Sequence, residues 1–200
     1  DGASARRISP RAARPREPLP QPPFEMKLLL ILMSVVLLAV LAFFGWASTL
    51  PDTLDVSRNR VIPAPSAAIH EVVADLRRWP EWSYWQAEDP NIQYTYSDDT
   101  ESVGAHVAFT QEAGSGEMTV TASDPSRGFF YDFTWGGGAT NQGSIEYEPA
   151  GEGTRVTMRM TGPTGGLVGR VIARLMSPTL VTAFDHNLAE IERLTLAAGE

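Results

Sequence analysis

The sequence predicts an α+β domain, with about six or seven antiparallel strands and one long C-terminal helix, preceded by a single membrane-spanning helix. Three observations predict it. A run of 20 uncharged, mostly apolar residues covers 28–47. Short alternating segments separated by turn residues fill 92–161, and an amphipathic segment follows over 168–195. A length of 200 residues suits one domain with appendages.

Residues 1–25 are rich in proline and arginine. They hold six prolines and five arginines but few side chains that could form a core, so we expect a disordered tail. The arginines are spread among prolines, which favours a solvated tail over a basic arm that binds anionic lipid or nucleic acid. Met26, directly before the apolar run, is a candidate for the biological start of the chain.

The apolar run 28–47 is long enough to cross a membrane. At 1.5 Å per residue, a helix over this run measures about 30 Å, the thickness of the hydrocarbon core. Trp46 at its end suits the membrane interface. Gly45 and Ala47 would also fit a signal-peptide cleavage site, but a signal core is shorter, at about 7 to 15 apolar residues. We therefore predict a signal anchor over 26–48.

Flanking charges predict how this helix is oriented. Five arginines and Lys27 precede it, while Asp52 and Asp55 follow it, so the positive-inside rule places the N-terminus in the cytoplasm. A start at Met26 would leave only Lys27 and the amino group to set this orientation. The domain over 49–200 is then extracytoplasmic.

The charge of the domain disfavours nucleic acid as a partner. From residue 28 onward, 10 Lys and Arg stand against 21 Asp and Glu, a net charge of −11, which repels phosphate backbones. The chain contains no cysteine, which excludes disulfides and thiol chemistry.

The domain begins with a strand and a helix. Residues 53–62 predict the first strand, which two nearby prolines end. Ser66 is a candidate cap for a helix over 66–78, whose apolar residues recur at helical spacing. Pro80 ends this helix or begins a short second one. Three tryptophans within seven residues follow at this corner, and we expect them to pack against the sheet or line a cavity: Trp79, Trp82 and Trp85.

Six further strands are predicted between turn segments. They cover Ile92 to Tyr96, Gly104 to Thr110, Glu117 to Ser123, Phe129 to Trp135, Gln142 to Glu148 and Arg155 to Thr161. Because side chains alternate along a strand, one face of the sheet is rich in aromatic rings and sulfur. It groups Met118, Val120 and Ala122; Phe129, Tyr131, Phe133 and Trp135; and Val156, Met158 and Met160.

The segment 168–195 is predicted to cover this apolar face as a long amphipathic helix. Pro178 lies inside it, so we expect a kink or a break, with Ser177 as a candidate cap of a second helix.

Three local sequences carry a resemblance to a known family: DLRRWPEWSYW over 75–85, ESVGAHVAF over 101–109 and GEGTRVTMRMTGP over 151–163. They resemble segments of polyketide cyclase/dehydrase-like domains of the START-like (SRPBCC) superfamily, membrane-anchored members included. The resemblance covers about residues 50–197. It implies a helix-grip fold, in which a curved antiparallel sheet wraps the last helix and leaves a cavity. The sequence departs from the common pattern at Tyr84 and Phe109, which bears on the shape of the cavity.

The resemblance implies a membrane-tethered domain that binds a hydrophobic small molecule or lipid without turnover, and no cofactor is predicted. We expect ligand contacts from Trp82, Trp85, Met118, Val120, Tyr131, Phe133, Trp135, Met158, Met176 and Phe184. Two alternatives remain open. One is a cyclase/dehydrase-type enzyme that uses the same cavity, and the other is a protein-interaction module with a filled cavity and an exposed apolar patch.

Few residues suit catalysis or metal binding. The histidines His70, His106 and His186 form no metal-binding pattern, so no metal site is predicted. His70, beside Glu71, is expected to face solvent. Lysine occurs only at position 27, which excludes Schiff-base chemistry in the domain.

Some titratable side chains could serve acid/base chemistry, but structural roles are favoured for them: Glu88, Asp132, Tyr84, Tyr131 and Tyr147. Four methionines fill irregular core or line an adaptable pocket: Met118, Met158, Met160 and Met176.

Overall fold

The computed structural model describes residues 24–199. The chain divides into two compact units, with the boundary between Phe43 and Phe44. Helix α1 (Phe24–Ser48) supplies the described part of the first unit and is long and apolar enough to cross a membrane. Phe24 and Glu25 are helical, so their assignment to a disordered tail was wrong. The rest of that predicted tail, residues 1–23, lies outside the described residues.

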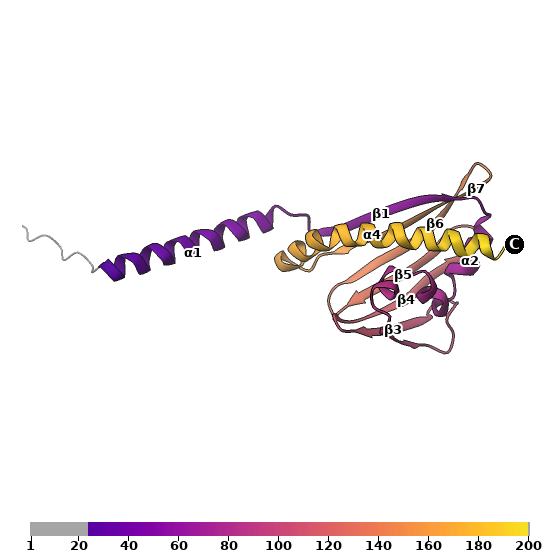
Figure 1. Cartoon of the computed structure of the whole chain (residues 1–200), viewed down its shortest axis with the longest axis horizontal. Helices are drawn as coiled ribbons and strands as arrows, with labels where there is room; N and C mark the ends of the chain where they lie inside the picture. The colour runs from indigo at the N-terminus through magenta and orange to yellow at the C-terminus, as the bar shows by residue number, and fades with distance from the viewer. Residues whose placement is uncertain (1–23, 200) are drawn as a thin grey trace, which may run out of the picture. The chain divides into compact units, whose positions relative to one another are not determined.

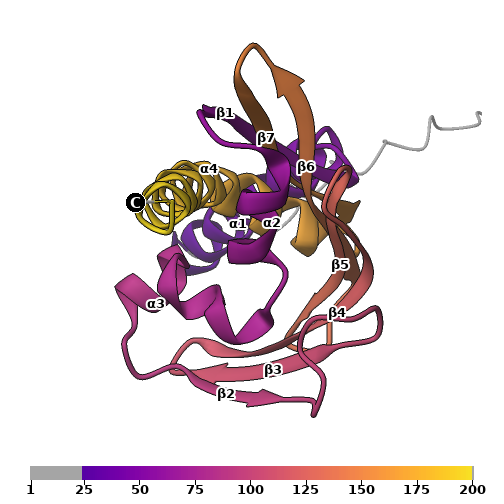
Figure 2. The same cartoon turned by 90° about the vertical axis from the view of Figure 1, so that its right-hand side faces the viewer.

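The second unit is built on one antiparallel sheet of seven strands, in the order β1-β7-β6-β5-β4-β3-β2. Figure 1 shows α4 running along this sheet, and Figure 2 shows the sheet curving around it. The predicted α+β, helix-grip architecture is confirmed. The strands are β1 (Thr53–Ile62), β2 (Gln93–Tyr96), β3 (His106–Gln111), β4 (Gly114–Asp124), β5 (Gly128–Trp135), β6 (Thr140–Ala150) and β7 (Gly153–Pro163).

Helix α4 (Leu167–Ala197) is one continuous helix, so no second helix begins at Ser177 within it. Ser177 donates its hydroxyl to the carbonyl oxygen of Ala173 at 2.6 Å, one turn back, and so acts within the helix rather than as a cap. Two ion pairs join α4 to the first strand: Arg60 to Glu192 at 2.5 Å and Arg58 to Asp185 at 3.5 Å.

Three short helices connect β1 to β2. Helix α2 (Ser66–Val73) ends earlier than predicted, a 3-10 helix η1 (Leu76–Glu81) contains Pro80, and α3 (Tyr84–Glu88) follows. Ser66 is the first helical residue and not the cap. The chain leaves the α-helix because Asp75 accepts hydrogen bonds from the backbone of Arg77 and from the hydroxyl of Thr100.

A bulge in β4 changes which side chains face inward. The pairing with β5 shifts between Val120 and Ala122, so Thr121 is the extra residue. Val120 is buried, whereas Ala122 is exposed, and the prediction that both share the buried face is wrong for Ala122. Ser123 pairs with Phe129 and takes the inward position instead.

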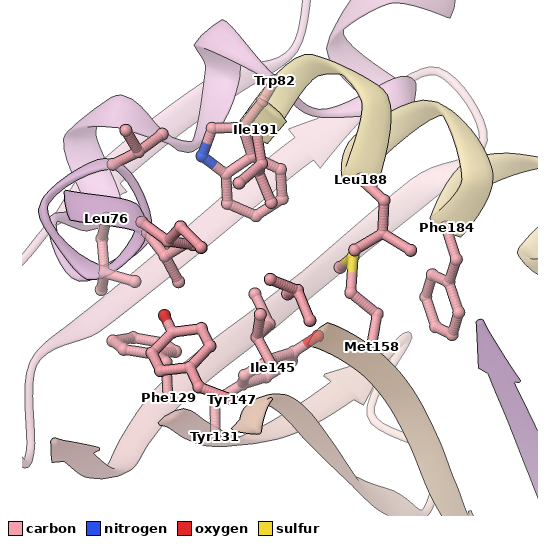
Figure 3. Packing of buried hydrophobic residues seen from close by; sticks show 14 of the residues in the cluster. Leu76, Trp82, Phe129, Tyr131, Ile145, Tyr147, Met158, Phe184, Leu188 and Ile191 are labelled. Atoms are coloured by element: carbon pink, nitrogen blue, oxygen red, sulfur yellow. The ribbon is translucent and has the colours of Figure 1, made fainter. Parts of the chain in front are cut away.

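The core lies between α4, α2 and the concave face of the sheet. In Figure 3, Phe184 and Leu188 of α4 point toward Met158 of β7, while Trp82 lies beside Ile191. Trp82 and Phe129 are the largest of the fully buried side chains among the described residues. The tryptophan-rich corner is therefore anchored in the core, as predicted.

Candidate functional site

A cavity of about 610 Å³ lies between the sheet, α4 and the tryptophan-rich corner. Its wall draws on every strand and on η1, α3 and α4. Antiparallel pairing lets strands far apart in sequence present alternate side chains to one concave face. A cavity of this size is in the range that holds small-molecule ligands.

Nine of the ten residues predicted to contact a ligand lie on this wall: Trp82, Trp85, Met118, Tyr131, Phe133, Trp135, Met158, Met176 and Phe184. Val120 does not. Its side chain is buried in the core cluster, and it pairs with Tyr131 in the sheet. Ligand contact by the nine stays a prediction, but the fold does bring them together.

Several further wall residues are not among the predicted ligand contacts: Leu54, Trp79, Tyr94, Phe109, Asn141, Met160 and Asn187. The sequence did predict that Trp79 and Met160 pack in the core or line a cavity, and both do lie on its wall. Asn141 and Asn187 carried no such signal, because a polar residue near the start of a strand or within a helix usually faces water.

Tyr131 keeps its place on the wall because its neighbour on β6 has no side chain. Tyr131 pairs with Gly143, and a Cβ atom added to Gly143 would collide with the tyrosine ring. The ring also contacts Trp79 edge-on, with centroids 5.2 Å apart. The glycine thus makes room for an aromatic surface on the cavity.

Two buried polar atoms of wall residues lack a hydrogen-bond partner among the described residues: the indole nitrogen Nε1 of Trp82 and Oδ1 of Asn141. Asn187, by contrast, accepts a hydrogen bond from the backbone N–H of Tyr84 at 2.7 Å. An unpaired buried polar group costs about 1–3 kcal/mol, so these two atoms lower the stability of the fold rather than face the cavity.

The described wall contains no Asp, Glu, His, Lys or Arg. Its two phenols are poor proton carriers at neutral pH. Burial, with smaller contributions from Tyr96 and Asp89, raises the pKa of Tyr94 to about 12, and burial also raises the pKa of Tyr131. Of the acid/base candidates, Tyr131 is on the wall, while Tyr84, Glu88, Asp132 and Tyr147 are not.

The cavity opens at one end of the sheet. The exposed members of its wall are Ala113, Trp135, Pro163, Ile172 and Met176. The end of β5 pairs with the start of β4, and the end of β7 pairs with the start of β1. These exposed residues therefore gather where β1 begins, a few residues after α1 ends.

His70 is buried, which corrects the expectation that it faces solvent. Its Nε2 lies 3.1 Å from the Ser123 hydroxyl, and its Nδ1 lies 3.3 Å from the Tyr147 hydroxyl. The β4 bulge places Ser123 within reach. Burial lowers the pKa of His70, an effect that Asp124 opposes in part. The neutral ring thus joins α2 to β4 and β6.

This histidine should make stability depend on pH. Its pKa is lowered in the folded state, so the unfolded chain binds the proton more readily once the pH falls below about 6.5. Stability is fully present above that pH and declines below it. We expect His70→Gln to flatten the decline in thermal unfolding temperature between about pH 6.5 and 5. His186→Gln is the control and should leave the decline unchanged; an unaltered decline in His70→Gln would contradict the assignment.

The family model described as polyketide cyclase/dehydrase and lipid transport matches residues 53–194. The match covers all seven strands and most of α4. A search among curated proteins finds no match.

Solved structures share the fold at low sequence identity. Norcoclaurine synthase of Thalictrum flavum, a point mutant with a transition-state analogue, is 15% identical with a TM-score of 0.54, covering 74% of this chain and 97% of that one. TTHA0849 of Thermus thermophilus is 19% identical with a TM-score of 0.52, covering 73% and 99%. The aromatase/cyclase StfQ of the steffimycin pathway is 10% identical with a TM-score of 0.55, covering 74% and 52%. The chain spans about half of StfQ (52%) and of DynU16 from the dynemicin locus (49%).

Proposed function

Because the chain belongs to the polyketide cyclase/dehydrase and lipid transport family, we propose that it binds a hydrophobic small molecule or lipid without turnover. The binding site is the cavity between the sheet and α4. Helix α1 tethers this domain to a membrane, with the N-terminus cytoplasmic and the domain outside the cytoplasm.

One observation carries this proposal: the cavity is lined mostly by aromatic, aliphatic and sulfur-containing side chains. The apolar wall favours a ligand that leaves water readily. A largely hydrocarbon molecule meets this requirement.

The wall supports binding over catalysis. Cyclisation and dehydration require a group that moves protons near neutral pH. The polar groups of the described wall are hydroxyls, amides and indole N–H groups, and its phenols have raised pKa values. A wall of this composition can hold and shield a ligand, but it supplies no general base.

The membrane tether suits such a ligand. Hydrophobic molecules partition into the bilayer, so a binding site held beside it meets a much higher local concentration than one free in water. The length and composition of α1 support a span.

The test is native mass spectrometry of the full-length protein extracted in mild detergent. We expect a bound apolar molecule that is released on unfolding and is chemically unchanged after incubation. Adding an excess of about 100 Kd of that molecule should stabilise the protein by about 2.7 kcal/mol. Ligand-free protein in repeated preparations, with no thermal shift across a panel of lipids and isoprenoids, would contradict binding. Conversion of the bound molecule to a product would favour the enzyme instead.

A further inference from the structure

The first half of α4 is apolar but not buried. The buried residues of this helix begin only at Ala183. Nine large hydrophobic side chains are exposed in the described chain beyond α1, and five of them lie within ten residues: Leu167, Val168, Ile172, Leu175 and Met176. Val168 is 70% exposed and Leu175 is 68% exposed. Ile172 and Met176 lie on the cavity wall, whereas Val168 and Leu175 do not.

The charge of this segment differs from that of the rest of the domain. Residues 153–184 contain four arginines and no acidic residue, although the chain is acidic as a whole. Arg174 is exposed, while Arg170 lies 4.0 Å from Asp52. Besides Asp52, the acidic residue Glu112 lies at this end of the sheet, in the turn between β3 and β4. A helix with exposed apolar side chains and arginines has the composition of an interfacial membrane helix.

The same segment is held beside the end of the candidate span. Arg170 donates hydrogen bonds to the carbonyl oxygens of Ser48 and Leu50, each at 3.2 Å. Ser48 is the last residue of α1. If α1 crosses the bilayer, Ser48 lies at its surface, and these bonds keep the turn around Arg170 there too.

We propose that the exposed face of α4 formed by Leu167, Val168 and Leu175 lies in the interfacial region of the bilayer that α1 crosses. This inference rests on the membrane tether of the proposed function. The mouth of the cavity lies at the same end of the domain, so it opens toward lipid. A ligand then passes from the acyl chains to the wall at Ile172 and Met176 without crossing bulk water.

Lipid fits this surface better than a protein partner does. The hydrogen bonds from Arg170 to Ser48 and Leu50 place this surface beside the C-terminal end of α1. Interfacial helices insert their apolar face about 5–10 Å into the headgroup and acyl boundary. Leucine and valine side chains in the first turns of α4 can reach this region while the later turns of the helix extend away from it.

The absence of cysteine allows a direct test. Leu175→Cys in the full chain is labelled with an environment-sensitive fluorophore and reconstituted in phosphatidylcholine/phosphatidylglycerol vesicles. Leu196→Cys is the matched control, since Leu196 is on the same helix and 40% exposed. It lies about 30 Å further along the helix axis. We expect nitroxide-labelled lipids to quench the Leu175 probe at least about threefold more than the Leu196 probe.

Other outcomes overturn the inference. Equal quenching of both probes by aqueous iodide, with none by lipid nitroxides, would mean that the surface faces water. Shielding of the Leu175 probe from both quenchers would assign the surface to a protein partner or a second copy. Leu175→Glu separates this inference from the proposed function. It should slow ligand uptake from vesicles about tenfold while leaving ligand binding in detergent unchanged. Failure of wild-type protein to bind any ligand in detergent would refute the proposed function, whatever the quenching shows.

Discussion

Trp82→Ala is expected to lower the free energy of unfolding by about 3–5 kcal/mol, enough to unfold much of the protein. Trp82 is 1% exposed and belongs to the core cluster that joins η1, α4 and the sheet. Its ring centroid lies 4.7 Å from that of Trp79, which in turn contacts Phe129 and Tyr131. Removal of the indole leaves a space beside Trp79 and Ile191 that helices and sheet cannot close by small shifts (Figure 3).

Trp85→Ala is the matched control, three residues along the same tryptophan-rich corner. Trp85 is only half-buried and lies on the cavity wall. We expect it to lose about 1 kcal/mol of stability or less and to weaken ligand binding instead. Chemical denaturation and ligand titration on both variants make the comparison. Equal losses of stability in the two variants would contradict the assignment of Trp82 to core packing and of Trp85 to ligand contact.

Phe184→Arg is expected to abolish ligand binding, with a loss of affinity of at least about 100-fold, or about 2.7 kcal/mol. Phe184 is 4% exposed, and Figure 3 shows it on α4 pointing toward Met158 across the core. A guanidinium group at this position would enter a wall that offers no carboxylate among the described residues. Burial of an unpaired charge is strongly unfavourable, so the cavity would fill with water or the domain would loosen.

Thr182→Arg adds the same charge two residues earlier, at an exposed position of α4, and should leave binding and folding intact. Phe184→Leu keeps the wall apolar and covers the case in which Phe184→Arg does not fold. It should bind the ligand with an affinity reduced by about tenfold or less. Full ligand affinity in folded Phe184→Arg would place the ligand elsewhere.

Local patterns were sufficient to predict the elements of this fold. The uncharged run at the N-terminus has the length of a span, and a helix covers it. Alternation and turn residues located the six strands β2 to β7, because a strand between a core and solvent buries every second side chain, and two prolines marked the end of β1. A spacing of about four located α4, whose buried stripe includes Phe184, Leu188 and Ile191. These signals depend on neighbours a few residues apart, so they can be read along the chain.

Features that depend on distant residues could not be predicted in this way. His70 is buried because Ser123 and Tyr147, which are 53 and 77 residues away in sequence, supply hydroxyls to its ring. A bulge, which no alternation pattern indicates, brought Ser123 to that position. Pro178 did not break α4. Proline removes one backbone hydrogen bond and crowds the preceding turn, but the packing of a 31-residue helix against the sheet and α2 outweighs this cost.

Sequence patterns thus predicted the apolar N-terminal helix, the strands, the long final helix and the apolar face between them, since each follows from spacing within one element. The cavity depends on how these elements meet. Three features set the wall of the cavity and the position of its mouth. They are the curvature of the sheet, the pairing of Tyr131 with Gly143, and the hydrogen bonds from Arg170 to Ser48 and Leu50. Each joins residues that are remote in sequence. Folding alone brings them into contact, so the exclusion of Val120 from the wall followed only from the assembled domain, whereas the nine residues on the wall are among those that the sequence predicts.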